Sequence, residues 1–393
     1  MALQIAYLAQ GRLYVKPPHG PAKEISSQFI ERANETARRD ADRHGWKSRE
    51  GTGPQMLPPT LLWRTSGRGG LTQVRITGAT RGAKSEILFT LNTEALGGLF
   101  SHDTADGSER RLYHKNGFTG RHLTRHPDKD LVALAIGGDQ LESHIAVTDT
   151  EGRHMRQVTE GESVDESPSW ATGHDETLVF QSAGIGRNAQ GIQTGIGPYR
   201  IEQLDLISGK MNTLREEDRY DFLNPRTDAA GSLYYIRRPW SASASPVSYW
   251  SMAAESLLFP FRLARAFVHF LNFFSMAFSG KPLLTSGGPP RPPQNTTTML
   301  LWGKLIDAEK ALKKSRGNIA APLVPSNWEL IRLAPDGREE ALRKSVASFD
   351  VTADGRVIYT NGTAVFMRDR DGRVETLCAD KLIETINCWT SPS

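Results

Sequence analysis

Cysteine is nearly missing from this sequence, since Cys378 and Cys388 are the only two among 393 residues. Two cysteines exclude a disulfide scaffold and leave one optional bridge, so a reducing compartment is favoured. An excess of one charge is missing too, because 48 basic residues stand against 44 acidic ones without a concentrated basic tail. The composition therefore gives no support for nucleic-acid binding.

The N-terminus lacks the pattern of a secretion signal. Its first residues, MALQIAYLAQGRLYVK, have no basic start and no apolar run of signal length before Gln10 and Arg12. They are typical of a strand. We therefore expect a cytoplasmic protein, either free or peripheral on a membrane.

Catalytic motifs are also missing. The chain has no Gly-x-Ser-x-Gly elbow and no phosphate loop that ends in Gly-Lys-Ser/Thr. No residue is assigned a catalytic, cofactor-binding or metal-binding role, and no cofactor is expected. Four histidines could approach one another on neighbouring strands, but without Cys or a fixed ligand spacing they are interpreted as ordinary surface residues: His102, His114, His122 and His126.

Two polar segments are weaker candidates. In GIGRNAQGIQTGIG, residues 184–197, the glycines and one arginine could cradle an anion, although a long hairpin loop is the favoured interpretation. Asp165 and Glu166 are interpreted as carboxylates on a connecting loop that accept backbone amides. The candidate anion-binding residues are Gly184, Gly186, Arg187 and Gly191.

Glycine and proline are abundant and punctuate a repeat. The 36 Gly and 22 Pro residues favour a turn-rich, mainly β fold. Between copies of the repeat lie hairpin patterns with the turns DTEG, DLISG, APDG and DRDG. Four segments share a polar turn followed by an alternating apolar strand: TRHPDKDLVALAIG from 124, DESPSWATGHDETLVFQSAG from 165, LNPRTDAAGSLYYIRRP from 223 and ASFDVTADGRVIYTNG from 347.

Two such halves make four antiparallel strands, the blade of a β-propeller. Pro127 to Pro168 is one period of about forty residues, the expected blade length. The N-terminal segment supplies three strands and lacks a first one, and IETINCW near the C-terminus is predicted to be that strand. The sequence therefore predicts an all-β, six-bladed propeller of four-stranded antiparallel blades, closed by pairing of the two ends of the chain.

The segment QVTEGESVDESPSWATGHDETLVFQS carries the clearest copy of the repeat. Its marker residues are Val158, Thr159, Pro168, Ser169, Trp170 and the strand from Leu178 to Phe180. In these residues the chain resembles the TolB-like β-propellers, whose blades carry Leu/Val-Thr, a short acidic loop, Pro-Ser-Trp, a turn and an apolar strand. The resemblance covers the chain outside residues 26–56 and 240–324, and it implies six blades and a role in binding other macromolecules.

Two insertions interrupt the strand pattern. In the first, 26–56, a short surface helix is predicted because five residues fall on one helical stripe: Phe29, Ile30, Ala33, Ala37 and Ala41. The second, 240–324, is predicted to be mainly helical and separates the propeller segments 1–239 and 325–393, between the second and third strands of one blade. Within it, GGPPRPP is typical of a stiff connector, and TMLLWGKLIDAEKALKKSRG, 298–317, is predicted to be a helix.

The second insertion also holds the most apolar run of the chain, SLLFPFRLARAFVHFLNFFSMAFSGKPLL from 256. Its polar residues form one helical stripe with two central arginines, which makes spanning a bilayer unfavourable. An amphipathic helix over 255–279 is predicted, with its apolar face on a membrane surface or in a partner groove; packing on its own propeller is the alternative. The predicted contact residues are Leu257, Leu258, Phe259, Phe261, Phe267, Phe270, Phe273, Phe274 and Phe278.

These features predict a non-enzymatic scaffold, bacterial in origin, that mediates protein–protein interaction in a larger assembly. Its expected partners are proteins and a membrane surface, and not nucleic acid. The alternative is a hydrolase or lyase that binds a small molecule in the central channel of the propeller.

Replacing Phe267, Phe270 and Phe274 by Ser should abolish liposome flotation or partner co-purification and leave the melting temperature nearly unchanged. Burying five of the apolar contact residues contributes roughly 7 to 15 kcal/mol, at about 1.5 to 3 kcal/mol each, and the substitutions remove much of it. A melting temperature lower by many degrees, in a protein whose wild type never associates, would instead show that the helix belongs to the protein's own core.

Overall fold

The chain divides into two compact units, Met1–Ser241 with Thr298–Ser393, and Ala242–Thr297. The second unit lies outside the described residues. The computed structural model describes residues 2–32, 35, 39, 74–92, 96–137, 142–190, 193–240, 298–307 and 321–391.

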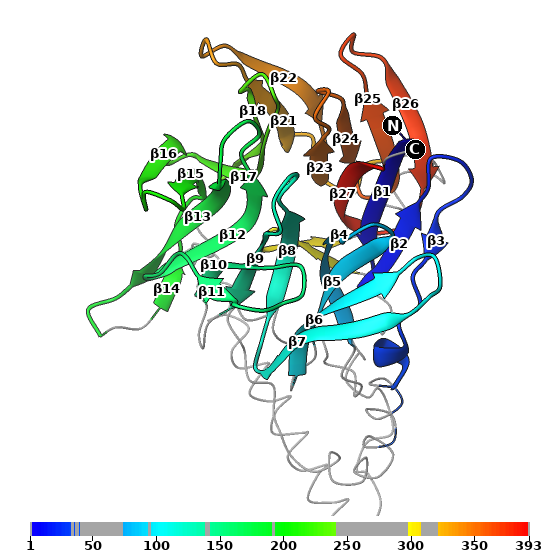
Figure 1. Cartoon of the computed structure of the whole chain (residues 1–393). Coiled ribbons are helices and arrows are strands. Elements are labelled where there is room, and N and C mark those ends of the chain that lie inside the picture. The colour runs from blue at the N-terminus through cyan, green and yellow to red at the C-terminus, as the bar shows by residue number, and fades with distance from the viewer. Residues whose placement is uncertain are drawn as a thin grey trace, which may run out of the picture. The chain divides into compact units, whose positions relative to one another are not determined.

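Four-stranded antiparallel units make up nearly all of the described structure (Figure 1). In pairing order, the unit at the chain ends contains β27 (Ile383–Ser391), β1 (Ala2–Ala9), β2 (Arg12–Lys16) and β3 (Lys23–Glu24). The next contains β4 (Arg75–Arg81), β5 (Glu86–Asn92), β6 (Leu96–Asp103) and β7 (Glu109–Asn116).

A nine-stranded sheet holds two further units, joined by one parallel bridge between Ser143 and Val164. The first contains β8 (Gly120–Arg125), β9 (Val132–Gly137), β10 (Ser143–Thr148) and β11 (Arg156–Gln157). The second contains β12 (Ser163–Trp170), β13 (Thr177–Arg187), β15 (Arg200–Asp205) and β16 (Met211–Arg215), and β14 (Gln193–Ile196) pairs with the end of β13.

The remaining strands form two more four-stranded sheets and one hairpin. The first sheet contains β17 (Tyr220–Thr227), β18 (Leu233–Pro239), β21 (Glu329–Leu333) and β22 (Glu339–Lys344). The second contains β23 (Ser348–Val351), β24 (Val357–Thr360), β25 (Ala364–Arg368) and β26 (Val374–Ala379). The hairpin pairs β19 (Thr298–Leu301) with β20 (Lys304–Asp307).

The first strands of the units contact one another in a closed cycle. β4 contacts β8, and the contacts continue through β12, β17, β23 and β27 back to β4. The cycle closes because β27 pairs antiparallel with β1, and Figure 1 shows the two ends of the chain close together. The predicted pairing of the chain ends is confirmed, and the fold is a β-propeller of four-stranded antiparallel units.

The apolar core lies between neighbouring units. One cluster joins Leu13 of β2 to Phe89 of β5, and another joins Ile5 of β1 to Ile358 of β24. Inner strands are therefore buried on both faces, which explains an unbroken apolar run such as VALAIG in β9. The outer strands β7, β16, β22 and β26 are mostly exposed and carry charges, which disfavours pairing with other chains.

The predicted hairpin turns are present. In DTEG, the Oδ1 atom of Asp149 accepts hydrogen bonds from the backbone amides of Glu151 (3.0 Å) and Arg153 (2.8 Å). Gly152 follows with φ 72°, a left-handed conformation that glycine adopts without a side-chain clash. The same type of turn joins β15 to β16, β21 to β22, and β25 to β26.

In the first insertion, residues 28–32 are helical, as predicted for this part of the segment. The Oγ atom of Ser27 accepts a hydrogen bond from the backbone amide of Ile30 (3.3 Å), which caps the start of the helix. Phe29 and Ile30 pack against the apolar cluster of β1, β2 and β5. Ala33, Ala37 and Ala41 lie outside the described residues.

In the second insertion, the helix predicted over 298–317 is wrong for its first ten residues. Residues 298–307 form the β19–β20 hairpin, which turns at Trp302 (φ 47°) and Gly303 (φ 73°). Two successive positive φ angles match the twist of a tight hairpin, and the turn falls between the apolar segments TMLL and KLID. Residues 308–317 and the apolar run 255–279 lie outside the described residues.

Deleting residues 382–393 should abolish cooperative thermal unfolding, because it removes β27 and opens the cycle. Ile383 and Ile386, which are 0% and 2% exposed, alone account for roughly 3 to 6 kcal/mol of burial. That loss is comparable to the total stability of about 5 to 15 kcal/mol of a typical domain. Circular dichroism melting and gel filtration measure the effect.

A chain that ends at Ser391 keeps the whole of β27 and should melt like the full chain, so it serves as the control. A wild-type melting temperature in the longer deletion would show that the ring is stable without closure.

Candidate functional site

A belt of hydrogen bonds links each first strand to the next around the propeller axis. We refer to these contacts as the axial belt. Thr77 Oγ1 of β4 donates to Gly120 O of β8 (2.5 Å), and Ser167 N of β12 donates to His122 Nδ1 of β8 (3.3 Å). Ser167 Oγ donates to Asn224 Oδ1 of β17 (2.8 Å), and Asn224 Nδ2 donates to Phe349 O of β23 (2.8 Å). Ile386 N of β27 donates to Ser348 Oγ of β23 (3.3 Å), and Asn387 Nδ2 of β27 donates to Ala79 O of β4, which completes the ring.

Three residues of the belt occupy equivalent positions in successive units. His122, Ser167 and Asn224 have φ angles of 53°, 52° and 54°, and each lies at a register shift against the second strand of its unit. A bulge re-aims a side chain, and here the re-aimed groups bond across the junctions. Pro168 is a repeat marker in the sequence, but sequence reasoning missed the polar residues Ser167 and Asn224, each of which precedes a proline.

The β19–β20 hairpin brings Trp302 to the axis. Its ring stacks on His122 of β8 with 5.1 Å between ring centroids, and its Nε1 donates to the carbonyl of Ala347 (2.8 Å), directly before β23. β8 and β23 lie three steps apart in either direction around the cycle. A side chain in contact with both must therefore cross the axis, and Trp302, only 8% exposed, fills the channel at this level.

The β19–β20 hairpin is held at the axis by the end of β18, where the second insertion begins. Arg238, at the end of β18, donates from Nη2 to the carbonyl of Trp302 (2.8 Å) and from Nε to Asp221 (2.8 Å). The side chains of Arg238 and Asp221 are both 3% exposed, so the ion pair is buried together with the hydrogen bond. Removal of either partner would leave a buried charge without compensation.

The environment of His122 disfavours its protonation. Burial, and then the positive charges of Arg121 and Arg226, lower the pKa of the imidazole to about 3. A neutral ring suits the axial belt, because Nδ1 has to accept the hydrogen bond from the Ser167 amide.

The interpretation of Asp165 and Glu166 as loop carboxylates is wrong, because both lie in β12 and are buried. Asp165 accepts a hydrogen bond from the hydroxyl of Ser182 (2.7 Å), and Glu166 pairs with Arg121 of β8 (3.0 Å). Charge alone favours a loop position for such residues. In the ring they face polar partners on neighbouring strands.

The four histidines are not brought together. His102 lies 3.4 Å from Glu109, His126 accepts the backbone amides of Asp128 and Lys129, and both are buried, so the surface interpretation is wrong for them. Packing between units buries these polar rings, which a period-two pattern alone does not reveal. Among the described residues, no group of three or more His, Cys, Asp or Glu side chains is placed to hold a metal ion.

The candidate anion loop lies at the β13–β14 hairpin. Gly184, Gly186 and Arg187 are residues of β13, and Gly191 lies outside the described residues. The Arg187 guanidinium is 2.9 Å from a carboxylate oxygen of Glu162 and 3.5 Å from one of Glu142. Two carboxylates therefore already surround the cation that was proposed to receive an anion.

The predicted contact residues of the amphipathic helix lie outside the described part of the chain. They are Leu257, Leu258, Phe259, Phe261, Phe267, Phe270, Phe273, Phe274 and Phe278. In the ranges that the structure describes, no helix is long and apolar enough to cross a membrane.

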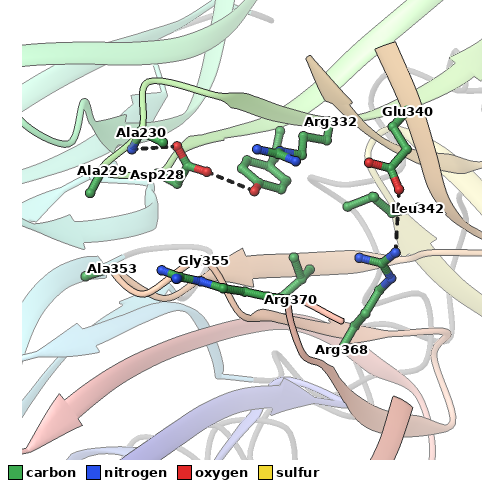
Figure 2. A pocket seen from close by; sticks show the side chains of 12 residues that line it. Asp228, Ala229, Ala230, Arg332, Glu340, Leu342, Ala353, Gly355, Arg368 and Arg370 are labelled. Carbon is green, nitrogen blue, oxygen red and sulfur yellow. Dashed lines mark hydrogen bonds and ion pairs between the residues drawn. The ribbon is translucent and has the colours of Figure 1, made fainter. Parts of the chain in front are cut away.

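A pocket of about 550 Å³ opens between the β17–β22 unit and the β23–β26 unit (Figure 2). We refer to it as the arginine pocket, because three arginines line it, two from strands and one from a turn. Figure 2 shows Arg332 and Glu340 on one side and Arg368 and Arg370 on the other. Its lining residues are Asp228, Ala229, Ala230, Tyr234, Arg332, Glu340, Leu342, Ala353, Gly355, Val357, Arg368 and Arg370.

Asp228 organises one wall of the arginine pocket. Its Oδ1 atom accepts hydrogen bonds from the amides of Ala230 (3.0 Å) and Ser232 (2.8 Å), and its Oδ2 atom accepts one from the hydroxyl of Tyr234 (3.0 Å). Burial and this carboxylate raise the pKa of Tyr234 to about 12. The Asp–Tyr pair is therefore engaged in structure, and the arginines supply the cationic side chains of the pocket.

Comparison with known proteins finds no matching family and no matching curated protein. Among solved structures, a chain of a nidogen/laminin complex is 9% identical, with 98% of each chain covered and a TM-score of 0.50. TolB from Acinetobacter baumannii is 11% identical over 98% of this chain and 66% of that chain, with a TM-score of 0.49.

An oligogalacturonate lyase in complex with manganese is 10% identical over 60% of this chain and 58% of that chain, with a TM-score of 0.33. At such identities a likeness concerns the fold alone. The β-propeller is identified by the closed cycle of four-stranded antiparallel units in the chain itself.

The stability of the protein should depend on pH through His122. Its folded-state pKa of about 3 lies below the ordinary value of 6.5, so the unfolded chain takes up the proton first as the pH falls. The contribution of the neutral ring is present above pH 6.5 and is lost as the pH falls toward 3. Between pH 7.5 and pH 5 the loss is at most about 2 kcal/mol, and urea denaturation at both pH values measures it.

The variant His122→Asn removes the titrating ring and keeps a side chain that tolerates positive φ, as Asn224 does in the equivalent position. Its stability should fall less than that of the wild type between the two pH values. An equal fall in both proteins would contradict the assignment to His122.

Proposed function

We propose that this protein is a non-enzymatic scaffold that holds protein partners on a six-bladed β-propeller, the six four-stranded units being its blades. The observation that carries the proposal is the contrast between the axis and the arginine pocket. Trp302 crosses the axis, whereas the pocket between two blades is open and rimmed by charged groups. This arrangement favours binding of a partner between two blades over catalysis in the central channel.

The composition of the arginine pocket supports partner recognition. Arginine and tyrosine are enriched at protein interfaces, since they combine a large contact area with directional hydrogen bonds. Arg332, Arg368 and Arg370 are presented by paired strands and a tight turn, so their positions are preorganised by the sheets. A rigid site loses little entropy when a partner docks.

The enzyme alternative would need a reacting group in the channel or in the pocket. At the level of Trp302 the axis is filled by an indole that stacks on His122 of one blade and donates a hydrogen bond to Ala347, directly before the first strand of the opposite blade. In the pocket, Asp228 already accepts three hydrogen bonds and is not poised as a general base. We therefore favour the scaffold.

The apolar run at 255–279 extends the proposal. A helix with one polar stripe would give the scaffold a second contact, with a membrane surface or with an apolar groove of a partner. Such a protein would act in the cytoplasm, free or peripheral on the membrane.

Affinity purification of the tagged full chain from its native cells should recover at least one protein at a constant ratio to the propeller. Quantitative mass spectrometry after mild crosslinking measures the ratio, and the crosslinks locate the contact. The matched control is a propeller of equal size purified through the same tag. Freshly purified protein that carries a small molecule by native mass spectrometry, with no protein at a constant ratio, would favour the enzyme.

A further inference from the structure

We propose that the arginine pocket binds an extended acidic segment of a protein partner, with Arg332 and Arg370 receiving its carboxylates. This inference rests on the scaffold function and names the chemistry of the partner. It follows from the length of the pocket, from the guanidinium groups that have no carboxylate partner, and from the apolar side chains between them.

The arginine pocket is a groove that runs outward from the axis. Its lining begins at Asp228 and Ala353, in the turns that follow the first strands of the two blades, and ends at Glu340 and Leu342 of the outer strand β22. Paired strands are about 4.8 Å apart, so four strands span roughly 14 Å. An extended segment of about four residues covers that length at roughly 3.3 Å per residue.

The positive charge of the arginines in the groove is only partly neutralised by carboxylates. The Arg368 guanidinium lies 3.6 Å from Glu340 and is paired. Arg332 instead donates to the hydroxyl of Ser232 (3.3 Å from Nε and 3.1 Å from Nη2), and Arg370 donates to the carbonyl of Asp354. Neither of these two has an ion pair with a carboxylate in the described ranges of the chain.

The two arginines stand on opposite blades. Arg332 belongs to β21, and Arg370 belongs to the turn between β25 and β26, so an occupant of the groove meets one guanidinium from each side (Figure 2). A guanidinium offers parallel N–H donors that match the two oxygens of a carboxylate. Two carboxylates on one segment would therefore bridge the two blades.

The wall between the arginines is partly apolar. Leu342 of β22, which is half-buried, lines the groove together with the largely buried side chains of Val357 and Tyr234. In an extended chain, alternate side chains point to opposite sides. A segment with two neighbouring Glu residues can therefore place one carboxylate on each arginine, and a Leu beside them can contact the side chain of Leu342.

A peptide fits this groove better than a phosphate does. The carboxylates of Asp228 and Glu340 also line it and repel a compact dianion. A longer ligand spreads its charges along the groove and keeps backbone N–H groups near those carboxylates. The observations therefore favour an acidic peptide over a small anion.

The test uses the full chain and a fluorescein-labelled peptide, Gly-Glu-Glu-Leu-Glu-Glu-Gly, with fluorescence anisotropy as the readout. The wild type should bind this peptide and should not bind the same peptide with Gln in place of Glu. Arg332→Gln and Arg370→Gln should each weaken binding roughly tenfold or more, because each removes a charged hydrogen-bond donor. Equal binding of the Gln peptide would overturn the proposal.

Arg373→Gln is the matched control, since it removes one exposed positive charge just before β26, three residues after Arg370, and Arg373 does not line the pocket. It should bind the Glu peptide like the wild type. Arg332→Lys keeps the charge but loses the planar fork, and it should bind with intermediate affinity. Affinities that fall equally in Arg373→Gln and Arg332→Gln would show a nonspecific charge effect and refute the site.

Two further arms separate this proposal from others. Sodium phosphate, compared with sodium chloride at equal ionic strength, should not displace the peptide, and complete displacement would make the pocket a small-anion site. In cells, a partner that still co-purifies with the Arg332→Gln, Arg370→Gln double variant would leave the scaffold function standing and refute the pocket as its docking site. Loss of that partner only in the double variant supports both.

Discussion

The antiparallel pairing of β27 with β1 is the contact on which the rest of the structure depends. The larger apolar clusters are each shared by two neighbouring units, so the units depend on one another for their cores. One open junction would expose a face on each side of the gap, together with the unpaired edge of β1. The stability of every blade is therefore tied to a pairing between residues at the two ends of the chain.

Closure of the ring also determines how the first strands are packed and hydrogen-bonded at the axis. The first strands converge there with polar backbone groups that need partners, because buried donors and acceptors are costly when unsatisfied. The axial belt supplies them through Ser167 and Asn224, at the cost of left-handed backbone conformations. Trp302 then fills the remaining space with a large ring and one hydrogen bond, and His122 stays neutral beneath it.

Sequence predicted the features that depend on local pattern. Turns such as DTEG are defined by Asp and Gly at fixed offsets, and the missing first strand of the N-terminal blade implied the pairing of the chain ends. The sequence prediction failed where contacts between blades decide whether a polar residue is buried. His126 and Asp165 were assigned to the surface or to loops from their polarity, yet packing between blades buries both.

The arginine pocket and the Trp302 hairpin were also missed, for a related reason. The pocket arginines come from β21, β25 and the turn after it, and nothing in their spacing indicates that they converge. The sequence TMLLWGKLID suits a helix as well as a hairpin, since short apolar segments fit either. Only contacts with His122 and Ala347, far away in the chain, select the hairpin.

The second insertion is fastened to the blade at both ends. Lys304 of β20 donates to the carbonyl of Pro239 (3.2 Å), and Arg238 donates to that of Trp302 (2.8 Å), so the chain leaves and returns at one place. Because the ends are already joined, extra length between them adds little closure entropy. Residues 241–297 can therefore carry a specialised sequence without loosening the blades, and the arginine pocket is lined by residues from both sides of that anchor in the chain, from the β17–β18 hairpin and from β21 onward.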